Sequence, residues 1–100
     1  MAELVNVRYE KMIVVPRDDL FTNNGLNTFD ALVWAAMANG YNWFAIMQEG
    51  KYTPTVTTLS NFLGLEFNYI STIMQRLEHK GLIENKGGYY VVYDYKKVLS

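Results

Sequence analysis

The strongest constraint on the fold is the order of signals along residues 57–93. A short segment with apolar residues at helical spacing is followed by Gly64, and a longer helical segment ends at Gly81. Gly87 and Gly88 then precede a run of aromatic and β-branched residues that is typical of a strand. Glycine just after a helix supplies the left-handed residue that lets the chain turn sharply. The pattern predicts two helices joined by a tight turn and followed by a small hairpin.

The helical pair is predicted over residues 56–80 and the hairpin over residues 82–93. In the second helix the apolar positions lie on one stripe: Ile70, Ile73, Met74 and Leu77. The end of this helix fits a Schellman motif, with Gly81 in the left-handed conformation and Leu82 packing back on Leu77. At the start of the first helix, the hydroxyl of Thr55 or Thr57 is expected to accept an unpaired backbone N–H.

The N-terminal half predicts an extended arm over residues 4–16 and a first helix over residues 27–40. Alternation of apolar and polar residues from Val5 onward is typical of a half-buried strand. The predicted buried face of the helix comprises Phe29, Leu32, Val33, Ala36, Met37 and Gly40. Asn27 and Asp30 have the spacing of a capping box, and Asn39–Gly40 is the predicted exit. Turn chemistry is expected at residues 18–19 and 23–25, the structure of residues 41–54 stays open, and residues 95–99 can form a final helical turn.

Composition excludes several functions. One hundred residues without cysteine predict a single domain, 1–100, with no disulfide and no thiolate metal site. His79 is the only histidine, and no phosphate loop, nucleophile elbow or metal-ligand cluster is present, so we expect no enzyme, cofactor, metal or evident small-molecule substrate. The longest apolar run is too short to span a membrane, which predicts a soluble cytoplasmic protein.

The segment from residue 53 to residue 83, TPTVTTLSNFLGLEFNYISTIMQRLEHKGLI, resembles the winged helix-turn-helix domains of plasmid replication initiators and phage replisome organisers. The resemblance extends over about residues 11–92. It implies an α+β winged helix-turn-helix fold with a three-helix core, a hairpin wing and an N-terminal arm. It also implies binding to double-stranded DNA through helix 67–80, in replication initiation or transcriptional regulation, with the wing touching the DNA backbone or minor groove.

The face of this helix opposite the apolar stripe carries residues that can read bases. Asparagine and glutamine can bond adenine in a bidentate manner, arginine can read guanine, and serine and threonine pair with several partners. The expected DNA contacts on the helix are Asn68, Tyr69, Ser71, Thr72, Gln75 and Arg76. A solvated surface is the alternative for the polar residues, and for Arg76 an ion pair with Glu66 or Glu78 is the alternative.

Three further residues are candidate phosphate contacts. Lys86 is at the predicted wing tip, where an ordinary polar turn is the alternative. Thr57 and Thr58 open the first helix of the pair, where free N–H groups and hydroxyls commonly meet a phosphate, although helix capping explains them equally well.

Charge and aromatic content keep a second function open. The net charge is −1, although residues 51–100 contain six Lys or Arg and four Asp or Glu. The helix also begins with Glu66 and Phe67, where relatives carry a hydroxyl cap and arginines. The alternative is therefore a winged-helix module for protein interaction that does not bind DNA directly. Eight aromatic residues exceed what a small core uses and suggest a homodimer through an aromatic surface: Tyr41, Trp43, Phe44, Tyr52, Tyr89, Tyr90, Tyr93 and Tyr95.

Overall fold

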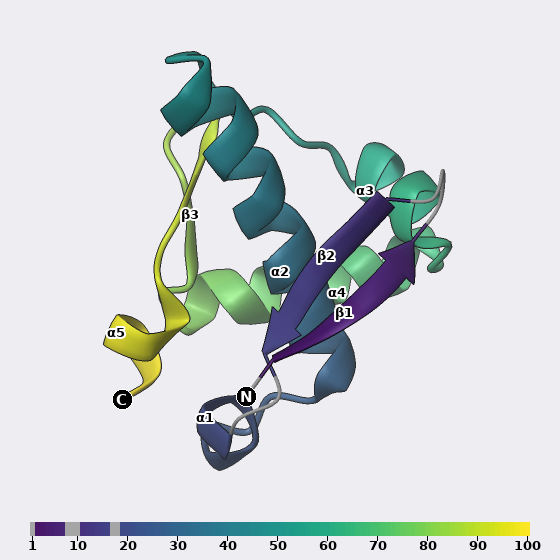
Figure 1. Cartoon of the computed structure of the whole chain (residues 1–100), viewed down its shortest axis with the longest axis vertical. Coiled ribbons are helices and arrows are strands. Elements are labelled where there is room, and N and C mark those ends of the chain that lie inside the picture. Colours follow the sequence, from purple (N-terminus) through teal and green to yellow (C-terminus); the bar gives the residue numbers. More distant parts are fainter. Residues whose placement is uncertain (1, 8–10, 17–18) are drawn as a thin grey trace.

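The computed structural model describes residues 2–7, 11–16 and 19–100 and has an α+β architecture that is mostly helical, with two separate antiparallel strand pairs. In chain order the elements are β1 (Ala2–Val7), β2 (Lys11–Pro16), α1 (Asp19–Asn23), α2 (Thr28–Tyr41), the π-helix η2 (Asn42–Met47), α3 (Val56–Leu63), α4 (Phe67–His79), β3 (Ile83–Asn85), β4 (Tyr90–Val92) and α5 (Tyr95–Leu99). Helix α2 runs through the middle, and β1–β2 lies across it (Figure 1). The pair β3–β4 and helix α3 flank α2 on opposite sides of this view.

The core lies where α2, α4 and the start of β3 meet. All four residues of the predicted α4 stripe are buried, and Ile70, Ile73 and Leu77 have no exposed surface. They pack with Val33 and Met37 of α2 and with Leu82 and Ile83, all at most 1 % exposed. Full burial of an aliphatic side chain contributes about 1.5–3 kcal/mol. The helical period of these positions therefore determines which face of α4 turns inward.

Helix α2 begins as the sequence predicts. The backbone N–H of Asp30 donates to Oδ1 of Asn27 at 2.9 Å, and the N–H of Asn27 donates to Oδ2 of Asp30 at 2.8 Å. This reciprocal pair is a capping box. The predicted buried face is wrong at Phe29, whose ring is 44 % exposed and packs edge-on against Tyr69.

The predicted exit of α2 at Asn39–Gly40 is also wrong. The chain remains helical through Gly40 and continues directly into η2, which ends at Met47. Gly40 is required for a different reason: a Cβ atom there would lie 2.5 Å from Cε1 of Tyr52. The glycine lets the Tyr52 ring pack directly on the helix backbone, so residues 41–54 fold as a π-helix followed by a segment held by Tyr52.

Burial of Tyr52 gives the first testable expectation. Desolvation raises the pKa of its phenol above the ordinary value. Because the folded-state pKa lies above the unfolded one, this stabilising contribution is complete below about pH 10 and is lost as the pH rises further. In urea titrations at about pH 8 and about pH 10.5, the unfolding free energy of the wild type should fall more than that of Tyr52→Phe. Equal losses in the two proteins would contradict the expectation.

The N-terminal arm is a hairpin rather than one extended segment. Strands β1 and β2 pair antiparallel, with Ala2 opposite Pro16 and Val7 opposite Lys11. The extended conformation agrees with the alternating pattern, but the pattern does not predict that two strands pair with each other. Residues 8–10, between the two strands in sequence, lie outside the described residues, and their sequence contains no Gly, Pro or Asn to signal a turn.

Two short helices complete the fold. Helix α1 was not predicted, although Gly25 follows it with a φ of 77°, in agreement with the turn expected there. Helix α5 is the expected final turn, and its Asp94 side chain accepts the backbone N–H of Lys96 at 3.0 Å. The rings of Phe21 and Tyr95, 5.1 Å apart between centroids, pack these two helices together.

Candidate nucleic-acid interface

Helices α3 and α4 form the tightly connected pair that the glycine pattern predicts. Thr55 caps α3, because its Oγ1 accepts the backbone N–H of Thr58 at 3.0 Å. Gly64 adopts a φ of 72° after the last turn of α3, and three residues later α4 begins. The Ser60 hydroxyl donates to the carbonyl oxygen of Leu65 and ties the turn to α3. The connection is therefore short and internally bonded, which fixes the direction of α4 relative to α3.

The end of α4 is the predicted Schellman motif. Gly81 has a φ of 80°, and its N–H donates to the carbonyl oxygen of Glu78 at 3.0 Å. The N–H of Leu82 donates to the carbonyl oxygen of Leu77 at 3.0 Å, and both side chains are fully buried. This motif sends the chain directly into β3.

The outward face of α4 carries the predicted polar residues. Asn68, Thr72 and Gln75 are exposed, and Ser71 is half-buried. Their spacing of three or four residues puts them on one stripe opposite the core. The Thr72 hydroxyl donates to the carbonyl oxygen of Asn68 at 3.0 Å, which leaves its oxygen available as an acceptor. This face can therefore offer amide and hydroxyl groups to a partner.

Tyr69 differs from these four residues. It is half-buried, and its ring packs edge-on against Phe29 at a centroid separation of 5.6 Å. We therefore assign Tyr69 to the contact between α4 and the first turn of α2 rather than to the polar stripe.

Arg76 pairs with neither Glu66 nor Glu78, the two partners that the sequence suggests. Its Nη2 donates to Oδ1 of Asp30 at 2.8 Å, and its Nε donates to both carboxylate oxygens at 3.1 and 3.2 Å. Asp30 is fully buried, and the Arg76 side chain is 36 % exposed. The hydrogen bond that Arg76 donates to Asp30 raises the pKa of Arg76. Since its guanidinium is held by α2, Arg76 positions α4, and the predicted pairs with Glu66 or Glu78 are wrong. A contact between the exposed part of Arg76 and DNA stays a prediction.

Sequence reasoning missed this link although both residues were considered separately. The carboxylate of Asp30 closes the capping box of α2 and also accepts the hydrogen bonds of the Arg76 guanidinium. A buried carboxylate needs both a charge partner and hydrogen bonds, which these two groups supply. The signal available in the sequence was an acidic residue on the predicted helix, 46 positions before its partner, and no local pattern connects positions so far apart.

The hairpin β3–β4, the predicted wing, lies beside the first turn of α3. Ile83 pairs with Val92 and Asn85 with Tyr90, within the predicted residues 82–93. The Asn85 side chain accepts the backbone N–H of Gly87 at 3.0 Å and closes the turn. The turn and the start of α3 border one depression of about 380 Å³, lined by Thr55, Val56, Asn85 and Gly88 among others. Wing tip and first turn of α3 therefore lie side by side.

Lys86 at the wing tip has a partner on the wing itself. Its Nζ lies 3.3 Å from Oε2 of Glu84, and the Tyr93 hydroxyl donates to Oε1 of Glu84 at 2.6 Å. The hydrogen bond from Tyr93 and then that from Lys86 lower the pKa of Glu84, whereas Glu84 raises the pKa of Lys86. Both side chains are more than 40 % exposed, so a phosphate can compete with Glu84 for Lys86.

Thr57 and Thr58 are exposed at the first turn of α3. The hydroxyl of Thr58 lies 2.8 Å from that of Thr55, so Thr58 shares in the cap that Thr55 makes.

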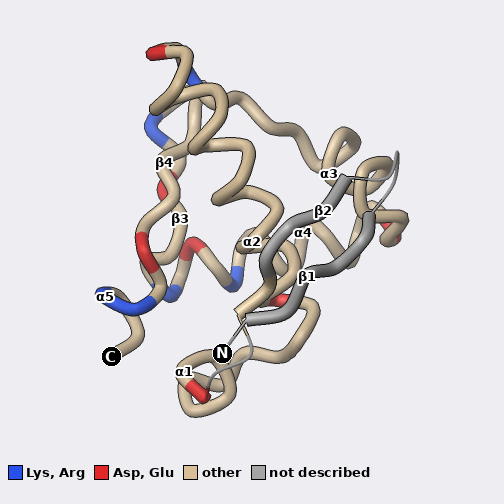
Figure 2. The backbone as a smooth tube through the Cα atoms, viewed as in Figure 1, with Lys and Arg blue, Asp and Glu red and all other residues tan. Residues whose placement is uncertain are grey.

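Helix α3 has no charged residue, and α4 carries only Arg76 and Glu78 besides His79. Figure 2 shows α3 tan, with Lys and Arg in blue beside the wing, along α4 and its end, and at α5.

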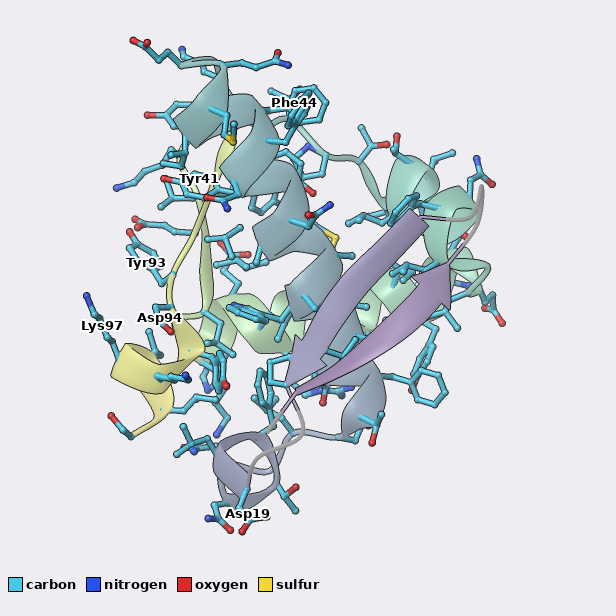
Figure 3. The ribbon with its side chains drawn as sticks, in the orientation of Figure 1. Asp19, Tyr41, Phe44, Tyr93, Asp94 and Lys97 are labelled. Atoms are coloured by element: carbon cyan, nitrogen blue, oxygen red, sulfur yellow. The ribbon has the colours of Figure 1, made fainter. Side chains whose placement is uncertain are left out.

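The aromatic residues do not form one exposed surface. Tyr52 and Tyr95 are buried, and Tyr41, Tyr89 and Tyr90 are half-buried. Trp43 and Phe44 are about half exposed on η2, and Tyr93 lies beside the wing strands (Figure 3). Ile46 and Met47, also on η2, are 57 % and 68 % exposed. Exposed apolar area is therefore concentrated at η2.

No protein-family model matches the chain, and comparisons with curated proteins and with solved structures find no significant match. Within residues 2–7, 11–16 and 19–100, no helix has the length and apolar character needed to cross a membrane. The same residues contain no group of three or more His, Cys, Asp or Glu that can hold a metal ion.

Proposed function

We propose that this protein is a non-catalytic winged helix-turn-helix protein that binds double-stranded DNA, with α4 in the major groove. The observation that carries the proposal is the uncharged polar stripe of Asn68, Thr72 and Gln75 on a helix held from both sides. The tight turn after α3 fixes one end of α4, and the ion pair with Asp30 anchors the other half to α2. Amide and hydroxyl groups on a rigid helix suit the reading of base edges.

The wing and the linker support the same proposal. The backbone N–H of Tyr90 donates to the carbonyl oxygen of Tyr52 at 2.8 Å, so the linker before α3 is bonded to the wing. This bond fixes the wing beside the first turn of α3, where Thr57, Thr58 and Lys86 are the proposed phosphate contacts. With so few cations nearby, we expect modest affinity and specificity derived mainly from base contacts. A role in replication initiation or in transcriptional control fits this mode of binding.

The test is an anisotropy titration with a random duplex pool at two salt concentrations, followed by selection of the bound sequences. We expect binding at about 50 mM salt that weakens as salt rises, with about 0.9 in log–log slope for each neutralised phosphate. Absence of any salt-sensitive duplex binding under these conditions would overturn the proposal.

A matched pair of triple variants tests the reading stripe on the selected duplex. Asn68→Ala, Thr72→Ala and Gln75→Ala together should weaken binding about 10- to 100-fold, because a good base contact is worth about 1–3 kcal/mol. The control carries the same three changes at exposed positions elsewhere: Asn23→Ala, Thr22→Ala and Gln48→Ala. Equal affinity of the two variants would place the binding surface elsewhere. Arg76→Ala is unsuitable as a contact probe because it also removes the partner of Asp30.

A protein-interaction module is the second candidate function, and the exposed apolar side chains of Ile46 and Met47 on η2 favour it. A homodimer through η2 would be one form of it and would also supply a second α4 for a two-fold DNA site. Sedimentation analysis of the wild type and of Ile46→Ser/Met47→Ser distinguishes these cases. A dimer lost in the variant supports η2 as the interface, and a monomeric wild type excludes self-association there.

A further inference from the structure

A half-open cavity of about 550 Å³ lies between the end of α2, η2, the linker and α3. Its walls include Gly40, Trp43, Phe44, Lys51, Tyr52 and Thr58. In Figure 3 Phe44 extends from η2 toward the linker that leads to α3. Cavities of about 300–1,000 Å³ with mainly apolar walls are typical of small-molecule sites.

The walls favour a flat aromatic ligand. The rings of Phe44 and Tyr52 are nearly parallel, with an interplanar angle of 11° and centroids 6.3 Å apart. Trp43 and Phe44 keep 52 % and 48 % of their surface exposed, although they border an apolar cavity. Aromatic rings pack well in offset or edge-on arrangements with a further ring, which would cover this surface.

Tyr52 supplies a polar group without a partner. The residue is 7 % exposed, and its hydroxyl has no hydrogen-bond partner among the described residues. Among the described residues, every side-chain nitrogen or oxygen atom that is fully enclosed has a hydrogen-bond partner. The Tyr52 hydroxyl has none, so it is not fully enclosed and faces open space. The cavity is the open space that Tyr52 lines. A hydroxyl that faces the cavity can bond to a ligand acceptor in place of water.

Lys51 gives the cavity its charge. Among the described residues in the walls it is the only charged one, and none of them is a carboxylate. Its Nζ lies 4.9 Å from the centroid of the Tyr89 ring and makes no ion pair within the described residues. An ammonium group without a carboxylate partner at the edge of an aromatic cavity favours an anionic ligand.

We propose that this cavity binds a small planar aromatic carboxylate. The ring packs against Trp43 and Phe44, and the carboxylate accepts hydrogen bonds from Nζ of Lys51 and from the Tyr52 hydroxyl. Because Thr58 and Leu59 also line the cavity, a bound ligand touches the first turns of α3. The site itself does not depend on DNA binding, so each proposal can fail without the other.

The experiment follows backbone amide NMR shifts of the full chain during titration with 2-naphthoate. We expect saturable shifts around η2, the linker and the start of α3, with a dissociation constant of about 0.1–1 mM for a ligand of this size. Neutral 2-naphthamide should bind about tenfold more weakly, because it lacks the charge that Lys51 recognises. Cyclohexanecarboxylate, which has the charge but no aromatic ring, should bind more weakly still. Shifts that do not saturate, or that map to another surface, would overturn the proposal.

Separate variants test the contribution of the Lys51 charge and that of the aromatic walls to ligand binding. Lys51→Gln should abolish the preference for naphthoate over naphthamide, whereas the matched control Lys97→Gln should keep it, since Lys97 is exposed on α5. Phe44→Ala should weaken naphthoate about tenfold, and Phe67→Ala, which removes an exposed ring outside the cavity, should not. Tyr52→Phe should weaken naphthoate while leaving the shift pattern in place. An unchanged naphthoate preference in Lys51→Gln would contradict the assignment, and since Lys51 is exposed this variant should retain the fold.

Discussion

Replacing Asp30 with Asn should lower the free energy of unfolding by about 2–3 kcal/mol. The variant keeps the size of the side chain and an oxygen for the capping box, but it removes the charge that faces Arg76. Loss of one partner from a fully buried ion pair costs about 3–5 kcal/mol, and the partial exposure of Arg76 reduces that cost. For a domain of this size the melting temperature should fall by about 10 °C or more.

The matched control for Asp30→Asn is Asp94→Asn. Asp94 is an exposed helix cap on α5, where asparagine caps about as well as aspartate, so its stability should change by less than about 0.5 kcal/mol. A double-mutant cycle with Arg76→Met assigns the effect to the pair. Asp30→Asn should cost much less in the Arg76→Met background than in the wild type. The same cost in both backgrounds would show that Asp30 acts only through its cap.

Replacing Gly40 with Ala should destabilise the protein by about 1–2 kcal/mol. Alanine is favoured over glycine in a helix by about 1 kcal/mol, so helical propensity alone predicts the opposite sign. The structure reverses this expectation because the new Cβ would lie 2.5 Å from Cε1 of the buried Tyr52 ring. Overpacking of this kind typically costs about 1–3 kcal/mol, which outweighs the gain in propensity.

Chemical denaturation of Gly40→Ala measures this effect, with Asn39→Ala as the control. Asn39 is exposed and precedes Gly40 in the same helix, so its replacement should be neutral or slightly stabilising. Combining Gly40→Ala with Tyr52→Ala should remove the clash, and the double variant should be more stable than the sum of the two single losses predicts. A stabilised Gly40→Ala protein would mean that the ring can move aside without cost.

Local patterns predicted most of the helix-turn-helix segment because its determinants lie within a few residues of one another. Gly64 and Gly81 have the positive φ values that their positions after a helix require. The cap of α2 and the stripe of α4 likewise depend on spacings of three or four residues. Such signals can be read from the sequence because the hydrogen bonds they make close within one helical turn.

The predictions from sequence were wrong where a residue far away in the sequence determines the local structure or the ion-pair partner. Gly40 was interpreted as a helix exit, but Tyr52, which lies 12 positions later, determines its role. For the ion pair of Arg76 the sequence suggests Glu66 or Glu78, which lie nearby in the sequence, but the fold brings Arg76 to Asp30. The cavity beside η2 had no sequence signal at all, since its walls come from the end of α2, the linker and α3.

The sequence by itself therefore determined the helices of the motif, their caps, the wing and the outward position of Asn68, Thr72 and Gln75. Only the tertiary structure decided which charges are free, because a buried carboxylate takes whichever cation the packing brings within reach. It also decided where apolar surface remains open, because that depends on how η2 and the linker pack around Tyr52. Periodicity orients one element at a time, whereas binding sites arise from surfaces that several elements build together.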